Sequence, residues 1–124
     1  MSGTKTRAYR PCVVLAQSGE GATPTRLRRL GWDVYQAGEG PEARRLAKML
    51  EPELVVIDVK LDDESGWLTC AKLAQERPAQ RIILLGEAGE RSQKMAEFVG
   101  ASAIVPCDDT LATLVAQADR PRAA

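Results

Sequence analysis

Short apolar runs alternate along this chain with amphipathic segments of helical period. The apolar runs lie at 12–17, 32–37, 54–57, 81–85 and 102–105. Most of them show no alternation of apolar and polar residues, which is typical of strands that are buried on both faces. Strands separated by helices form a parallel sheet with helices on both sides, because right-handed crossovers leave few other arrangements. We therefore predict an α/β fold, a doubly wound five-stranded parallel sheet in the order 2-1-3-4-5.

The first three intervening segments have the signals of helices. In the clearest one, apolar residues recur at i, i+3, i+4 and i+7 between two prolines: Ala43, Leu46, Ala47 and Leu50, between Pro41 and Pro52. A short helix is expected after Thr23, its cap, and Gly31 ends it after about two turns. Another is expected from Trp67 to Glu76. We expect Trp67 to pack against the sheet, although an aromatic ring can also stack on a ligand.

Two further helices complete the pattern. The apolar face of the first holds Met95, Phe98 and Val99, which by their spacing we assign to the core and not to a partner surface. The last helix has an apolar face of its own, made of Leu111, Leu114, Val115 and Ala118. The domain is thus expected over residues 11–118, between a disordered tail at 1–10 and a C-terminal tail at 119–124.

Composition excludes several classes of function. Seventeen basic and seventeen acidic residues cancel, so no overall charge favours nucleic acid or a membrane surface. No apolar run is long enough to cross a bilayer, and Cys12, Cys70 and Cys107 fit free thiols, so we expect a cytoplasmic protein. The chain has no histidine, which excludes a Ser-His triad and a histidine phosphodonor. We expect no enzymatic activity.

One acidic residue stands at the end of a buried strand. In the segment LVVIDVKLDDESGW, residues 54–67, the apolar run stops at Asp58. Ligands of doubly wound sheets collect at the carboxyl ends of the strands, where the residues that follow the other strands would be its neighbours: Gln17, Ser18, Gly86, Glu87 and Cys107. A solvated aspartate that only forms a turn is the alternative. The loop acids after it, at 62–64, are expected to be solvated.

Three segments together resemble the response-regulator receiver domain of two-component signalling, which has a flavodoxin-like fold. They are LVVIDVKLDDESGW, GASAIVPC at 100–107 and GWDVYQAGEGPEA at 31–43. The resemblance implies that Asp58 corresponds to the aspartate that accepts a phosphoryl group from a histidine kinase. In that family a bound Mg²⁺ and a lysine stabilise the charge of the transferred group.

The chain departs from the family at every other working position. The two acids that hold Mg²⁺ are matched by Ala16-Gln17 or by Gln17-Ser18, depending on the alignment. Glycine replaces the phosphoryl-sensing hydroxyl, cysteine the lysine and isoleucine the aromatic switch residue, at Gly86, Cys107 and Ile104. We therefore expect a degenerate receiver, or pseudo-receiver, which binds no Mg²⁺ and acts through a protein partner of a phosphorelay, such as a histidine kinase or another signalling domain.

Two alternatives stay open. Asp58 could accept a phosphoryl group with substitute cation ligands from Glu20 or Glu87. More distantly, GEGA at 19–22 lies where a nucleotide-binding domain has its glycine-rich loop, although the third glycine of that motif is absent. The sequence names no partner and fixes no oligomeric state.

Overall fold

The computed structural model describes residues 9–19, 21–87 and 89–106. Its five strands form one sheet in the order β2-β1-β3-β4-β5, and every neighbouring pair is parallel. The strands are β1 (Cys12–Ala16), β2 (Asp33–Ala37), β3 (Leu54–Asp58), β4 (Ile82–Leu85) and β5 (Ala103–Val105). The predicted sheet and its strand order are confirmed.

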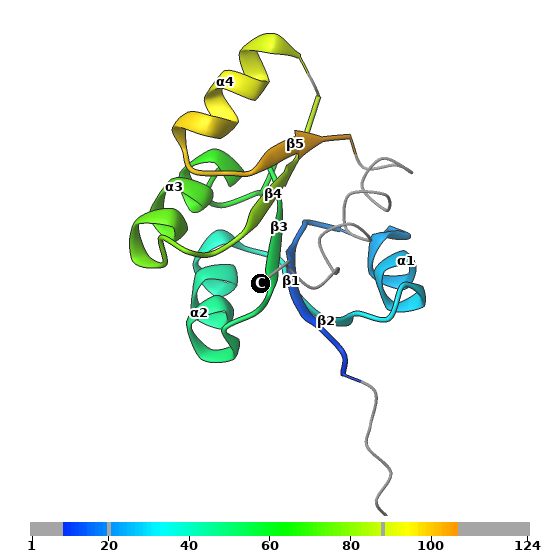
Figure 1. Ribbon diagram of the computed structural model, residues 1–124. Helices are drawn as coiled ribbons and strands as arrows, with labels where there is room; N and C mark the ends of the chain where they lie inside the picture. The colour runs from blue at the N-terminus through cyan, green and yellow to red at the C-terminus, as the bar shows by residue number, and fades with distance from the viewer. Residues whose placement is uncertain (1–8, 20, 88, 107–124) are drawn as a thin grey trace, which may run out of the picture.

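Helices cover both faces of this sheet, as Figure 1 shows. They are α1 (Thr23–Arg29), α2 (Gly40–Leu50), α3 (Gly66–Glu76) and α4 (Glu90–Phe98). Within the described part of the chain, α1 lies on one face, and α2 and α3 lie on the other. None of the described helices is long and apolar enough to span a membrane. The predicted last helix, over residues 111–118, lies outside the described residues, as does the tail at 119–124.

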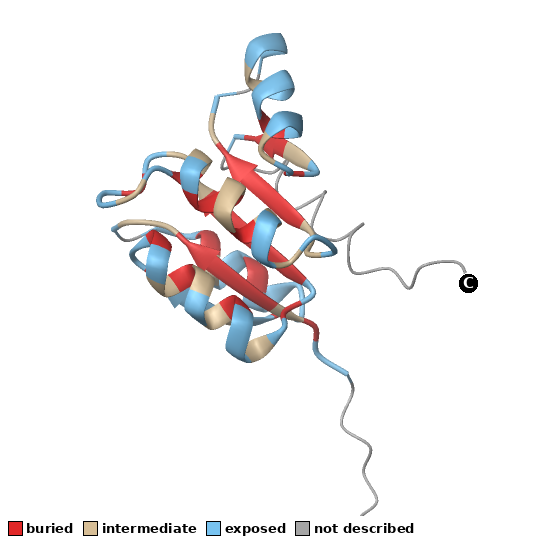
Figure 2. Cartoon of the chain, turned by 90° about the vertical axis from the view of Figure 1, so that its left-hand side faces the viewer, coloured by how far each residue is buried: buried red, intermediate tan, exposed pale blue. Residues whose placement is uncertain are grey.

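The strands carry side chains into two separate apolar clusters, one on each face. The cluster under α2 and α3 includes every second strand residue: Val14, Ala16, Val55, Ile57, Ile82, Leu84 and Ile104. The cluster under α1 includes the residues between them, Val13, Leu15, Leu54, Val56, Ile83, Leu85 and Val105, and Leu27 of α1. Most residues of β1, β3, β4 and β5 are therefore buried, drawn in red in Figure 2, whereas the edge strand β2 exposes Asp33, Tyr35 and Gln36. This burial explains why their sequence shows no polar alternation.

Three details of the helices differ from the expectation or refine it. The residue before α1 is Ala22, so Thr23 is the first residue of the helix and not its cap. In α4 the core prediction was wrong for the two largest side chains, because Met95 is 47% and Phe98 is 86% exposed. Ala96 is the buried residue of this helix, and its small side chain lets α4 rest on the cluster. Trp67 packs against that cluster, as predicted.

The described cysteines are free thiols. Cys12 is half-buried and Cys70 is buried. The Cys70 thiol donates a hydrogen bond to the carbonyl oxygen of Val99 at 3.4 Å, and burial raises its pKa to about 11. Cys107 lies outside the described residues.

Candidate functional site at the carboxyl edge of the sheet

Asp58 is the last residue of β3, the central strand. It is paired in register with Leu85 of β4, and Ile57 before it is paired with Ala16 of β1. Gln17, one residue further along, therefore comes level with Asp58. Because side chains alternate along a strand and Val56 faces α1, Asp58 and Gln17 both point to the α1 side of the edge. Asp58 thus lies at the carboxyl end of the central strand, as predicted.

The carboxylate of Asp58 turns back onto its own loop. Its Oδ1 accepts a hydrogen bond from the backbone N–H of Lys60 at 2.9 Å, the bond of a turn-forming aspartate. Within the part of the chain that the structure describes, this is the one polar contact of the carboxylate. The side chain is half-buried, so water reaches it.

The positions that match the family's acid pair differ among themselves. Ala16 is fully buried and belongs to the cluster under α2 and α3. A carboxylate there would lie among apolar side chains, which is costly without a partner. Gln17 and Ser18 are half-buried at the edge, and the Ser18 hydroxyl oxygen is buried without a hydrogen-bond partner among the described residues. The edge therefore has room for polar groups at Gln17 and Ser18, but not at Ala16.

Gly86 and Ile104 leave no space for a swinging side chain. A Cβ atom added to Gly86 would lie 3.0 Å from Cγ2 of Val59 and 3.2 Å from Cδ1 of Ile104, which is tighter than most contacts of real Cβ atoms. Ile104 itself is only 1% exposed and belongs to the cluster under α2 and α3. A side chain at position 86 would therefore need Val59 and Ile104 to shift by a few tenths of an ångström.

A Mg²⁺ ion does not fit the residues that are described at this edge. Mg²⁺ needs octahedral oxygen ligands and binds through carboxylates. Asp58 is the one acid there; Glu87 is exposed in the loop after β4, and Glu20 lies outside the described residues. No three acidic or thiol side chains within 9–19, 21–87 and 89–106 gather closely enough to hold a metal ion. Asp63 of the following loop is also turned away, since its Oδ1 accepts a hydrogen bond from the N–H of Gly40 at 3.3 Å.

The structure reveals a cluster of charged and polar side chains around Glu64 that the sequence analysis does not predict. Glu64, expected to be solvated, has a side chain only 11% exposed. It accepts hydrogen bonds from Lys72 Nζ at 2.9 Å and from Thr69 Oγ1 at 2.7 Å, and Arg44 Nε lies 3.5 Å away. Burial raises the pKa of Glu64, but these hydrogen bonds and the charges of Lys72 and Arg44 outweigh it and hold the pKa below its usual value. No local spacing signals this cluster, because Arg44 comes from a different helix.

Gly66 fixes the loop between the two acids. Its N–H donates a hydrogen bond to the carbonyl oxygen of Val59 at 3.1 Å. A Cβ atom at this position would collide with the backbone of Asp58 and Val59. The start of α3 therefore approaches the end of β3 closely enough that only glycine fits.

A doubly wound sheet in this order, with an aspartate that closes its central strand, defines the class of receiver-like α/β domains. Comparison with known proteins then gives the family. The family model described as "Response regulator receiver domain" matches residues 21–115, well over half of the chain, and the chain belongs to this family of two-component signalling domains. The match begins after β1, the strand that carries Ala16.

Individual relatives agree with this assignment. The chain is 41% identical over 59 residues to the probable transcriptional regulatory protein TcrX of Mycobacterium tuberculosis, a match that covers 48% of this chain and 25% of TcrX. The chain spans between 25% and 38% of the length of the curated relatives it matches.

Solved structures share the fold. A CheY-like receiver domain protein from Methanospirillum hungatei superposes with a TM-score of 0.77 at 20% identity, over 90% of this chain and 95% of that one. A response regulator from Burkholderia pseudomallei, solved with a phosphorylated aspartic acid, calcium and citrate, gives a TM-score of 0.73 at 27% identity, over 87% of this chain and 65% of that one.

Proposed function

We propose that this chain is a degenerate receiver, which takes part in phosphorelay signalling through protein–protein contacts and without Mg²⁺-dependent phosphorylation of Asp58. The burial of Ala16 is the observation that carries the proposal. Where the family has an acid pair, this chain offers a methyl group in an apolar cluster and the neutral side chains of Gln17 and Ser18. Phosphoryl transfer needs charge stabilisation at this point, and these groups supply none.

The packing around Gly86 supports the same proposal. A phosphoryl-sensing hydroxyl is absent, and the carbon atoms of Val59 and Ile104 occupy the space that its side chain would need. An isoleucine that is 1% exposed has nowhere to swing. Cys107, at the position of the family lysine, brings no positive charge.

A protein-binding role agrees with the surface of α4. Met95 and Phe98 are large apolar side chains that this helix exposes and does not bury. Exposed apolar residues of this size are suited to contacts with another protein. The partner that we propose is a histidine kinase or another domain of a two-component pathway.

Phosphorylation tests the proposal directly. The protein is incubated with acetyl phosphate and Mg²⁺, and its intact mass is measured over time beside that of a receiver domain with a complete acid pair. We expect no phosphoryl adduct while the comparison domain is labelled, because loss of even one preorganised charge slows such steps by about a hundredfold or more. A stoichiometric adduct that Asp58→Ala abolishes would refute the proposal and favour substitute ligands such as Glu20 or Glu87.

A rescue experiment asks whether the missing acids are the cause. We choose Gln17 and Ser18 for the two acids, because a carboxylate at the buried Ala16 would be costly. We expect Gln17→Asp with Ser18→Asp and Cys107→Lys to gain Mg²⁺ binding, measured by isothermal titration calorimetry. The same triple variant with Asp58→Ala is the matched control and should not bind. Absence of Mg²⁺ binding in the triple variant would show that the geometry of the edge, and not its ligands alone, has changed.

A further inference from the structure

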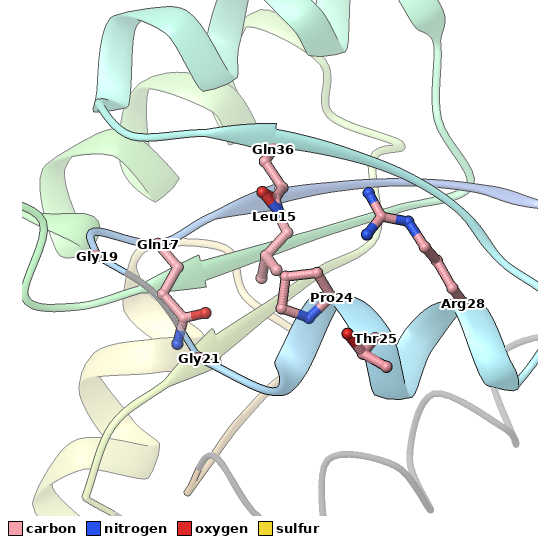
Figure 3. Close-up of a pocket in the computed structure, with 8 residues that line it drawn as sticks. All are labelled: Leu15, Gln17, Gly19, Gly21, Pro24, Thr25, Arg28 and Gln36. Carbon is pink, nitrogen blue, oxygen red and sulfur yellow. The ribbon is translucent and has the colours of Figure 1, made fainter.

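A cavity of about 230 Å³ opens on the α1 side of the sheet, beside the carboxyl ends of β1 and β2. Figure 3 shows the residues that line it: Leu15, Gln17, Gly19, Gly21, Pro24, Thr25, Arg28 and Gln36. Leu15 and Gln36 are register partners on neighbouring strands and form its floor. Asp58 does not line this cavity, which shares only Gln17 with the positions of the family's acid pair.

The short helix α1 forms one wall of the cavity. The helix has seven residues, and the two that it buries against the sheet are Thr23 and Leu27. Pro24, Thr25 and Arg28 follow on the neighbouring face, at spacings of three and four residues, so they line one wall together. Leu15 is 1% exposed and packs in the same cluster as Leu27, so only its edge reaches the cavity, which the exposed side chains of Thr25, Arg28 and Gln36 border on the solvent side.

The lining has the chemistry of an anion site. Arg28 is its one charged side chain among the described residues, and no described acid lines it. The other polar groups are neutral: the amides of Gln17 and Gln36 and the hydroxyl of Thr25. A guanidinium group presents a fork of N–H donors that matches a carboxylate or a phosphate. We propose that this cavity binds a small organic anion, with its carboxylate or phosphate at Arg28 and a neutral hydroxyl-bearing end at Gln17.

The orientation follows from the charges at the two ends. In Figure 3 the Arg28 and Gln17 side chains lie at opposite ends of the cavity, with Leu15 and Pro24 between them. Gln17 is level with Asp58, whose negative charge repels an anion at that end. The ligand's charged group therefore lies at Arg28. Its size is limited too, since the volume is below the range of about 300 to 1,000 Å³ for sites of drug-sized ligands.

This site goes beyond the proposed function and does not depend on it, because Asp58 does not line the cavity. A ligand bound here would nevertheless lie against Gln17, the neighbour of Asp58 on β1. A bound ligand would therefore contact the carboxyl edge of the sheet, which is the edge that carries the phosphorylated aspartate in conventional receivers.

Titration followed by ¹⁵N NMR tests the proposal. The probes are inorganic phosphate, glycerol 3-phosphate, glycerate and, as the neutral control, glycerol. We expect saturable shifts of the side-chain amides of Gln17 and Gln36 with glycerol 3-phosphate or glycerate, at affinities in about the millimolar range, and none with glycerol. The stronger of the two organic anions identifies the charged group as phosphate or carboxylate. Phosphate alone should bind more weakly, because it cannot reach Gln17.

Matched charge variants separate this site from general attraction. Arg28→Gln should weaken binding about tenfold or more, whereas Arg29→Gln, which removes the same charge from a neighbour outside the lining, should change it less than twofold. Thermal unfolding of both variants checks that they remain folded. Equal losses in the two variants, or shifts that appear at Lys60 and Gly86 in place of Gln17 and Gln36, would overturn the proposal. So would the absence of saturable shifts with every anion.

Discussion

Asp58 and Glu64 stand six residues apart on one loop, and they lie in opposite surroundings. Asp58 ends a strand on the α1 side, is reached by water, and has one hydrogen bond, from the backbone of Lys60. Glu64 lies on the other side, nearly buried, with Lys72, Thr69 and Arg44 around it. The acid at the family's reactive position is therefore the poorly supported one.

The charge interactions of this loop are concentrated at Glu64 and not at Asp58. Buried polar groups need partners, and the cluster at Glu64 supplies them across two helices and a loop. In the described part of the chain Asp58 has only the backbone N–H of Lys60 as a partner, and the nearby Gly86 is approached by aliphatic atoms of Val59 and Ile104. Charge here joins α2, α3 and the loop that carries Glu64.

Gly66 joins the two regions, and its substitution should have the largest effect. Gly66→Ala places a Cβ atom against the backbone of Asp58 and Val59, which cannot move aside as a side-chain tip can. We expect a loss of about 3 kcal/mol in the free energy of unfolding, measured with urea. Gly38→Ala is the matched control, because an added Cβ atom there meets nothing within 4 Å. Comparable losses in both variants would contradict the close approach of α3 to β3.

Glu64→Gln should lower the free energy of unfolding by less than Gly66→Ala does, and it tests the surroundings of Glu64 directly. At neutral pH we expect a loss of about 2 kcal/mol in the free energy of unfolding, because the nearly buried Glu64 loses the charge that Lys72 and Arg44 face. Glu90→Gln removes an exposed partner of Lys94 at 3.6 Å and should change stability by less than about 0.5 kcal/mol.

The pH dependence has a definite sign. The folded-state pKa of Glu64 is below its usual 4.5, so its contribution is present above that value and is lost as the pH falls through the folded pKa. The lead of the wild type over Glu64→Gln should therefore shrink in urea titrations on the acid side. If the difference in unfolding free energy between the wild type and Glu64→Gln stays constant as the pH falls below 4.5, the charge of Glu64 is not what stabilises the cluster.

Asp58→Asn should have the smallest effect. Asparagine keeps an oxygen that accepts the hydrogen bond from the N–H of Lys60, and no described partner is lost. We expect a change within about 0.5 kcal/mol in the free energy of unfolding. A loss as large as that of Glu64→Gln would break the comparison, because it would mean that the carboxylate of Asp58 has a charged partner.

The sheet and the position of Asp58 could be predicted from the sequence, because strands buried on both faces leave unbroken apolar runs. The inward face of α4 could not be predicted, because spacing alone does not say which of two apolar stripes meets the sheet. The small residue Ala96 is buried there, whereas Met95 and Phe98 are exposed. The Glu64 cluster and the cavity at Arg28 were also missed. Both depend on residues that the fold brings together from separate elements, so no local pattern marks them.

The contact of Gly86 with Val59 and Ile104 has a consequence for how such a domain carries information. A conventional receiver distributes itself between two conformations, and a signal changes their populations. Here a side chain at position 86 would meet Val59 at 3.0 Å and Ile104 at 3.2 Å, so both neighbours would have to shift to admit the residue that senses the phosphoryl group in the family. Under the proposed function, the domain does not respond to phosphorylation, so the amount of partner that it binds follows from the concentrations of the two proteins.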